Sequence, residues 1–395
     1  MSSTAFVRGM VDPQRQTEIQ ALIPAEPLEK KRDHIPFAKR GWRRLTEYEA
    51  VMLHAQNSLD AVPGSQEVGE TVQKWPGGRP NYGIESTAVL ASNWFYFRDP
   101  AKRWFMPYVK QKTEEGQTAE RVMKSWAENG DCEMMDTAWR SEILARQYGA
   151  FIYNEYGLFS AHSTIVYSAL SDLLKTWIAE AGFDKNDAGQ MIQMERVLLG
   201  KIFADFDPSL VDAKQAWTQD ALWKPAREFV EHIWAGTYDW VEQLWAIHGI
   251  YDHIFGQFVR REFFQRVAGI HGDTLTPVIQ SQAMVYHGQA ADGLQALCLK
   301  MLIDEEPVYA GHNRRYLRAW TARYLPQTVR ALKGFLGIYK QVPVKLDGVT
   351  CRVGVQASVE RVIDGWARRF AEPIGFKFDR AAVVGEIMSG YSEGK

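Results

Sequence analysis

The chain has 395 residues, of which 46% are hydrophobic and 24% charged, as in soluble proteins that form a core. Its 46 basic and 48 acidic side chains give a formal net charge of −2, which argues against nucleic-acid binding. No apolar run approaches the roughly 18–20 residues of a membrane span, and none forms a secretory signal. Three widely spaced cysteines, Cys132, Cys298 and Cys351, fit no disulfide or zinc pattern and favour a cytoplasmic protein.

Residues 1–44 differ from the rest of the chain, because they combine four prolines with mixed charge and weak periodicity. Two interpretations stay open: a solvated tail, or an extended arm that orders on a partner. Interspersed apolar residues favour the arm, and the irregular stretch 61–84 is a second candidate for partner binding. The predicted interface residues are Phe6, Leu22, Ile23, Ile35, Phe37, Trp42, Arg43, Trp75, Arg79 and Tyr82.

Residues 45–395 are predicted to form a single helical domain. Proline inside a helix costs roughly 3 kcal/mol, and the chain has none between Pro107 and Pro208. Apolar residues spaced by three and four predict long helices, and Gly149 and Gly157 mark positions where one of them bends or breaks. The predicted helices cover residues 45–60, 86–98, 144–177, 191–202, 223–245, 258–270, 278–303, 314–340, 355–370 and 379–389.

Two short segments interrupt the helical pattern. Alternating residues around Asp347-Gly348 predict a small β-hairpin near 342–353. Residues 184–189 resemble part of a calcium-binding loop, but Ala188 brings no ligand oxygen to the fifth position. We therefore predict a turn between two helices there, with Asp184 or Asn186 capping the second helix.

Long helices with inward-facing Glu and His side chains suggest a dimetal carboxylate site. Such a site takes a Glu from each of two helices and a Glu-x-x-His pair from each of two others, because residues three apart share a helix face. The chain has nine histidines, and none has Asp or Glu three residues before it. The pattern predicts that this chain has neither metal ligands nor catalytic residues.

Two alternatives remain beside that prediction. A dimetal oxidase with unusual ligands would have to draw on acidic residues of predicted inner faces and one histidine: Glu155, Glu195, Glu228, Glu231 and His232. The other alternative is a helical binding module unrelated to metal chemistry.

Aromatic residues make up 12% of the chain, and we expect most of them in the core.

Several segments, in their order along the chain, carry a resemblance. They are Asn93-Trp-Phe-Tyr-Phe-Arg-Asp-Pro100, Trp217-Thr-Gln-Asp220, Trp223-Lys-Pro225, Arg227-Glu228 and Tyr238-Asp-Trp-Val-Glu242. Nearly the whole chain resembles β subunits of the bacterial multicomponent diiron monooxygenases, above all of the soluble methane monooxygenase hydroxylase. Similar patterns occur in the β subunits of toluene and phenol hydroxylases, which stay as an alternative.

The resemblance implies an all-α, ferritin-like bundle with extra helices that has lost its metal ligands. It implies a non-catalytic, structural β subunit without a cofactor, in an α2β2γ2 hydroxylase with α and γ subunits and a second β subunit. In that family the diiron centre of the α subunit oxidises methane to methanol with O2 and electrons from NADH. A reductase and a regulatory protein act on the complex, and the N-terminal region of β lies over α.

Overall fold

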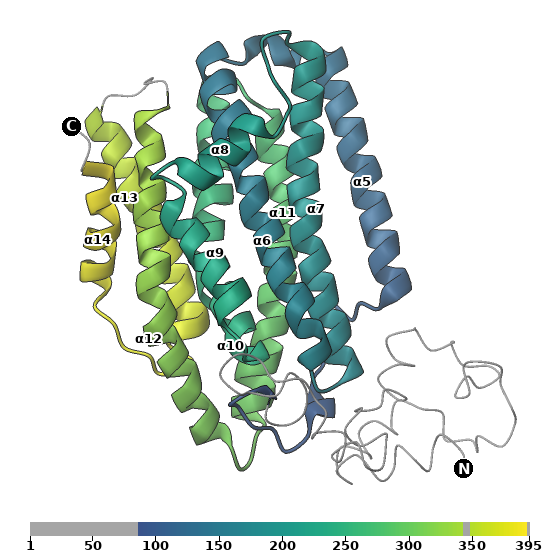
Figure 1. Cartoon of the computed structure of the whole chain (residues 1–395), viewed down its shortest axis with the longest axis vertical. Coiled ribbons are helices and arrows are strands. Elements are labelled where there is room, and N and C mark those ends of the chain that lie inside the picture. Colours follow the sequence, from purple (N-terminus) through teal and green to yellow (C-terminus); the bar gives the residue numbers. More distant parts are fainter. Residues whose placement is uncertain (1–85, 343–347, 393–395) are drawn as a thin grey trace, which may run out of the picture.

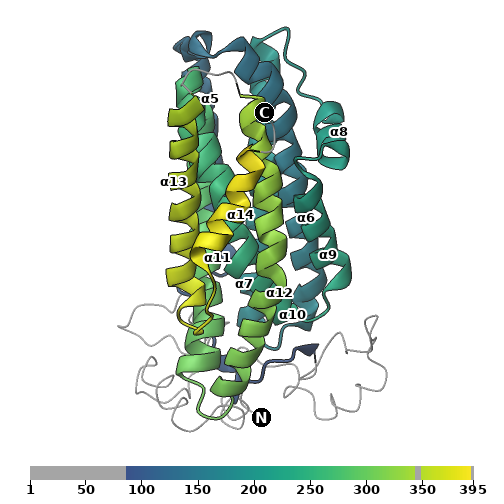
Figure 2. The same cartoon turned by 90° about the vertical axis from the view of Figure 1, so that its left-hand side faces the viewer.

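The computed structural model describes residues 86–342 and 348–392, where the regular elements are all helices (Figures 1 and 2). The α-helices are α5 (Phe105–Glu128), α6 (Gly149–Ile165), α7 (Asp172–Ile202), α8 (Val211–Gln219), α9 (Lys224–Gly236), α10 (Trp240–Leu244), α11 (Leu275–Gln295), α12 (Ala310–Phe335), α13 (Gly348–Trp366) and α14 (Arg380–Ser392). The π-helical segments are η5 (Trp139–Tyr148), η7 (Trp245–Gly256), η8 (Phe258–Gln265), η10 (Ala296–Asp304) and η12 (Ala367–Ala371). Short 3-10 turns are η3 (Trp94–Tyr96), η4 (Asp131–Met134), η6 (Val166–Ser168), η9 (Ala268–His271) and η11 (Leu336–Lys340).

Four long helical rods form the centre of the molecule. One is α7, and the others continue from π-helix to α-helix or the reverse: η5 with α6, α10 with η7 and η8, and α11 with η10. The connection through α8 and α9 returns the chain to the end where α7 began, so the rod containing η7 and η8 runs parallel to α7 (Figure 1). One long crossover of this kind is typical of ferritin-like bundles.

Further helices cover two sides of this centre. The helix α5 packs on α7 and α11, while α12, α13 and α14 lie together on the opposite side (Figures 1 and 2). Large aromatic side chains fill the space between the rods, which confirms their predicted place in the core. The tryptophans with less than 2% exposure are Trp139, Trp177, Trp223, Trp240, Trp245 and Trp366.

The helix predicted from Leu144 onward is present, but its two glycines do not bend or break it. They let neighbouring helices approach, because a Cβ at Gly157 would lie 2.3 Å from Val230 Cγ1 and one at Gly149 would lie 2.7 Å from Ala213 Cβ. The chain turns later, after η6, where the Ser171 hydroxyl accepts a hydrogen bond from the backbone of α7.

The turn predicted at 184–189 is wrong, since these residues continue the helix α7 without interruption. Neither Asp184 nor Asn186 caps a helix. The backbone stays helical because the side chains of Asp184 and Lys185 are buried in ion pairs with neighbouring elements, which leaves Asp184 unavailable as a cap. A Cβ at Gly189 would make only ordinary contact, 3.6 Å from Ile152 Cγ2, so this glycine is not required by the packing.

The helix predicted at 86–98 is also wrong, apart from the single turn η3. The reason is that side chains from the residue capping α10 and from the start of α12 provide hydrogen bonds to this backbone instead. Asp239 Oδ2 accepts a hydrogen bond from the Ala88 N–H at 2.6 Å. Asn313 accepts from the Leu90 N–H and donates to the Leu90 carbonyl, at 2.9 and 2.7 Å. Such side-chain partners hold the segment in an irregular, non-helical conformation at the end of the bundle.

Two other segments depart from the prediction. Residues 348–353 belong to α13 and not to a hairpin, because Val355, Val359 and Val362 recur at helical spacing and are buried together. The helix α5 lacked a strong apolar signal, since only Ala119, Met123 and Trp126 of its 24 residues are buried. Residues 343–347 and the predicted helix 45–60 lie outside the described residues.

Candidate functional site

The residues predicted as partner contacts are not placed by the structure, because they lie outside its described ranges, as does the predicted arm 1–44. These residues are Phe6, Leu22, Ile23, Ile35, Phe37, Trp42, Arg43, Trp75, Arg79 and Tyr82.

The five ligands of the alternative dimetal site do not converge. Glu155 and Glu195 are fully buried but belong to separate hydrogen-bond networks. Glu228, Glu231 and His232 are exposed on α9. Across residues 86–342 and 348–392, no group of three or more His, Cys, Asp or Glu side chains is arranged to hold a metal ion.

Charged side chains meet at the centre of the bundle, in a cluster that we call the central network. It consists of Glu155 of α6, Lys185 of α7, Asp252 of η7, Arg260 of η8 and His287 of α11. Arg260 Nη2 lies 2.5 Å from Glu155 Oε2, and Arg260 Nη1 donates to Asp252 Oδ1 at 2.9 Å. Lys185 Nζ pairs with Asp252 and lies 3.6 Å from Glu155 Oε2. Each of the four central rods thus contributes to one ion cluster.

Hydrogen bonds add to the ion pairs of both acids in the central network. Asp252 Oδ2 accepts hydrogen bonds from Lys185 and from His287 Nδ1, the latter at 2.9 Å, while Glu155 Oε1 accepts one from Asn154 Nδ2 at 2.9 Å. Both oxygens of Asp252 and Oε1 of Glu155 therefore accept hydrogen bonds, whereas Glu155 Oε2 is held by its ion pairs with Arg260 and Lys185. Such hydrogen bonds and ion pairs offset part of the free-energy cost of burying these charges.

The electrostatics of the central network favour a charged Asp252 and a charged Arg260 beside a neutral imidazole of His287. Burial alone raises the pKa of Asp252, but Lys185, Arg260 and His287 hold that pKa well below its usual range. Burial alone lowers the pKa of Arg260, but Glu155 and Asp252 raise it overall. The pKa of His287 is lowered, mainly by burial, which favours its neutral form.

Gly256 makes room for the central network. It lies four residues after Asp252 and four before Arg260 on the same rod, directly beside their ion pair. A Cβ at this position would lie 2.1 Å from Asp252 Oδ1 and 2.6 Å from Arg260 Nη1. A glycine is therefore required for the two charged groups to meet across it.

Two histidines form a buried pair near the central network. His162 Nε2 lies 2.7 Å from His248 Nε2, and His162 Nδ1 lies 2.7 Å from the Leu158 carbonyl. Burial lowers the pKa of His162 to about 4 and that of His248 well below its usual value. The pair is therefore neutral at pH 7, and it acts as a hydrogen-bonded core pair.

A further buried acid, Glu195 of α7, faces η5 and α11. Its two oxygens accept hydrogen bonds from Tyr148 at 2.9 Å and Thr276 at 2.6 Å. Burial, with a smaller contribution from Asp273, raises the pKa of Glu195 to about 8. The side chain is therefore largely protonated at pH 7.

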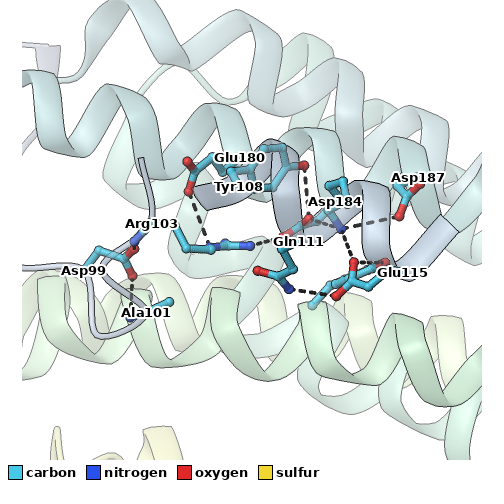
Figure 3. Close-up of polar contacts among 11 residues, drawn as sticks. Asp99, Ala101, Arg103, Tyr108, Gln111, Glu115, Glu180, Asp184 and Asp187 are labelled. Atoms are coloured by element: carbon cyan, nitrogen blue, oxygen red, sulfur yellow. Dashed lines mark hydrogen bonds and ion pairs between the residues drawn. The ribbon is translucent and has the colours of Figure 1, made fainter. Parts of the chain in front are cut away.

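A third group, which we call the α5–α7 network, attaches the outer helix α5 to the bundle (Figure 3). Its centre is Asp184, which lies 2.6 Å from Lys112 Nζ, 3.3 Å from Arg103 Nη1 and 3.2 Å from the Tyr108 hydroxyl. Burial raises the pKa of the neighbouring Glu180 to about 7, although Arg103 opposes this shift. The network is a polar interface between helices.

Sequence reasoning missed the central network, and one signal could have revealed it. Asp252 and Arg260 are charged residues within a largely apolar stretch, and both lie four residues from Gly256. Charges on a fully buried rod require partners of opposite sign. The sequence could not show that those partners are Glu155 and Lys185, since they lie on two other helices.

No helix within the described parts of the chain is both long and apolar enough to span a membrane. Residues 73–306 match the family described as Methane/Phenol/Alkene Hydroxylase. The chain is 41% identical over 383 residues to the methane monooxygenase component A beta chain of Methylococcus capsulatus (strain ATCC 33009 / NCIMB 11132 / Bath), covering 97% of both chains. It is 38% identical over 398 residues to the protein of the same name from Methylosinus trichosporium, covering 99% of this chain and 98% of that one.

A solved structure of phenol hydroxylase from Pseudomonas sp. OX1 has a similar fold. The TM-score is 0.66 at 16% identity, over 90% of this chain and 98% of that one. Together with the helical rods described above, this likeness confirms the predicted all-α, ferritin-like fold class. The chain belongs to the methane/phenol/alkene hydroxylase family.

Proposed function

We propose that this chain is the β chain of a methane monooxygenase hydroxylase. The observation that carries the proposal is 41% and 38% identity, over nearly the entire chain, to two proteins named as methane monooxygenase component A beta chains. The 16% identity to the phenol hydroxylase structure supports the fold alone. Methane is therefore favoured over toluene or phenol as the substrate of the complex.

Within that complex the chain acts as a non-catalytic scaffold. The proposed assembly is an α2β2γ2 hydroxylase in the cytoplasm, in which the diiron centre lies in the α subunit. Electrons from NADH arrive through a reductase, and a regulatory protein controls the reaction. The central network supports this division of labour, because Lys185 and Arg260 pair with the carboxylates in the bundle core, which is where ferritin-like dimetal proteins bind their metal ions.

Exposed apolar side chains support a role in an assembly. On α6 and α7, Tyr156 and Phe183 are 57% and 52% exposed, and their rings lie 6.0 and 6.1 Å from the ring of Phe159 between them. At the start of α5, Phe105 and Met106 are 65% and 54% exposed. Exposed apolar groups of this kind are common where another protein binds.

The proposal is tested by locating the iron. We expect the chain to copurify with a larger companion from the native source and, after separation of the chains, the iron to remain with that companion. Omitting this chain from a reconstituted complex should abolish methane oxidation. Two iron ions that stay with this chain, or full activity without it, would contradict the proposal.

The behaviour of the chain alone gives an independent test. An obligate interface buries on the order of 2,000–5,000 Å². We therefore expect the full-length chain, expressed without companions, to self-associate or precipitate, and analytical ultracentrifugation measures this directly. A well-behaved monomer would argue against the scaffold role.

A further inference from the structure

The central network draws its side chains from four rods of the bundle, as a ferritin-like dimetal site does, but it is an ion-pair cluster. In ferritin-like dimetal proteins, four bundle helices point carboxylates and histidines at two metal cations. Here four rods also meet, and they contribute the two carboxylates of Glu155 and Asp252 and the imidazole of His287. The difference lies in Lys185 and Arg260, whose side chains extend between these acids.

The residues present do not fit a bound metal. Arg260 contacts both acids, at 2.5 and 2.9 Å, and Lys185 contacts both as well. A metal ion would need the same oxygen lone pairs, and it would lie next to two fixed positive charges. Both cations are almost fully buried, with side-chain exposures of 6% and 1%, so water does not screen this repulsion.

We infer that Lys185 and Arg260 supply, inside this bundle, the positive charges that metal ions supply in ferritin-like dimetal proteins. The two acids and two cations of the central network then sum to zero charge. This inference concerns the interior of the chain itself, and it holds whether or not the assembly proposed above is correct.

Charge balance makes a specific prediction about combined substitutions. Lys185→Ala with Arg260→Ala leaves two buried acids without cations, and an uncompensated buried charge is strongly destabilising. We expect the folding equilibrium constant to fall roughly 100-fold or more. Adding Glu155→Gln and Asp252→Asn to that double variant removes the remaining charges. Glu→Gln and Asp→Asn hardly change the side-chain volume. Any stability that the quadruple variant regains over the double variant therefore comes from removing the two negative charges.

The experiment uses the full-length chain, with its companions present, and follows its own gel band during brief proteolysis across a urea series. The quadruple variant should resist proteolysis at higher urea than the double variant. Arg196→Ala is the matched control, because Arg196 is equally buried but bonds to backbone carbonyls and to Gln193. Glu155→Gln with Asp252→Asn should not rescue that control.

Metal addition tests the second half of the inference. Millimolar Mn²⁺ or Co²⁺ should protect the Lys185→Ala/Arg260→Ala chain and leave the wild-type and quadruple chains unchanged. Protection of the wild-type chain, or no protection of the double variant, overturns the inference.

If the Lys185→Ala/Arg260→Ala variant does not accumulate, the quadruple variant is compared with Glu155→Gln/Asp252→Asn. This second double variant leaves Lys185 and Arg260 buried without negatively charged partners. A quadruple variant that folds when this second double variant does not supports charge balance. A quadruple variant no more stable than either double variant overturns it.

Discussion

Asp184 and Lys185 are consecutive residues of α7, yet their charges belong to different networks on two different sides of the helix. Asp184 lies 2.6 Å from Lys112 of α5, whereas Lys185 pairs with Asp252 inside the bundle. Because successive residues on an α-helix point about 100° apart, one segment attaches the outer helix and also neutralises the centre. This is why an apparent loop sequence forms a helix.

The α5–α7 network should control how firmly α5 is held. Asp184→Ala leaves Lys112 and Arg103 without their shared partner, and we expect it to weaken α5 docking by about 2–4 kcal/mol. Hydrogen exchange of the α5 amides measures this. Asp187→Ala is the control, because its contact with Lys112 is longer, at 3.4 Å, and its side chain is 29% exposed. Equal exchange in the Asp184→Ala and wild-type chains would contradict the prediction.

Glu195→Gln should change how stability depends on pH. The pKa of Glu195 is about 8 when folded, against 4.5 as its ordinary value, so the folded chain holds a proton that the unfolded chain has lost between these pH values. Glu195 therefore contributes its full stability below pH 4.5, and this contribution falls as the pH rises to 8.

Gln does not titrate, and it can accept from one of the two hydroxyls through its oxygen while its NH2 group donates to the other. We expect the free energy of unfolding of Glu195→Gln to exceed that of the wild-type chain by roughly 2–4 kcal/mol at pH 9, with the difference vanishing near pH 4.5. Urea unfolding at several pH values measures it. A constant difference across that range would show that the acid is charged when folded.

The His162–His248 pair should have fixed tautomers. The Leu158 carbonyl can only accept, so His162 carries its proton on Nδ1 and accepts at Nε2 from His248 Nε2–H. Nitrogen NMR of ¹⁵N-histidine-labelled chain should show these two forms from pH 8 down to about pH 5. His162→Gln and His248→Gln assign the signals. A protonated imidazolium at pH 7 would refute the neutral pair.

Gly256→Ala should break the ion pair across this position. The added methyl would overlap Asp252 Oδ1, so we expect a loss of about 2–4 kcal/mol in the free energy of unfolding. Gly288→Ala is the matched control, because a Cβ there meets nothing within 4 Å. Since alanine favours a helix, that control should gain up to about 1 kcal/mol. Similar effects at both positions would rule out a special role for Gly256.

Sequence reasoning predicted the elements whose apolar spacing is strong. The helices expected at 278–303 and 314–340 correspond to α11 with η10 and to α12 with η11, because periodic burial determines them. It failed where side chains from distant segments decide the backbone, as at 86–98, where Asp239 and Asn313 provide the hydrogen bonds. The partners of Arg260 were likewise unpredictable, since tertiary packing brings them together.

The bonds between Leu90 and Asn313 join residues 223 positions apart in the chain. During synthesis at roughly 5–20 residues per second, Asn313 is made about 10–45 s after Leu90. Residues 86–104 are therefore among the first described residues to leave the ribosome, yet Leu90 cannot dock until α12 has begun to form. In that interval the segment is accessible to a chaperone or a companion subunit, because it has not yet docked on α12.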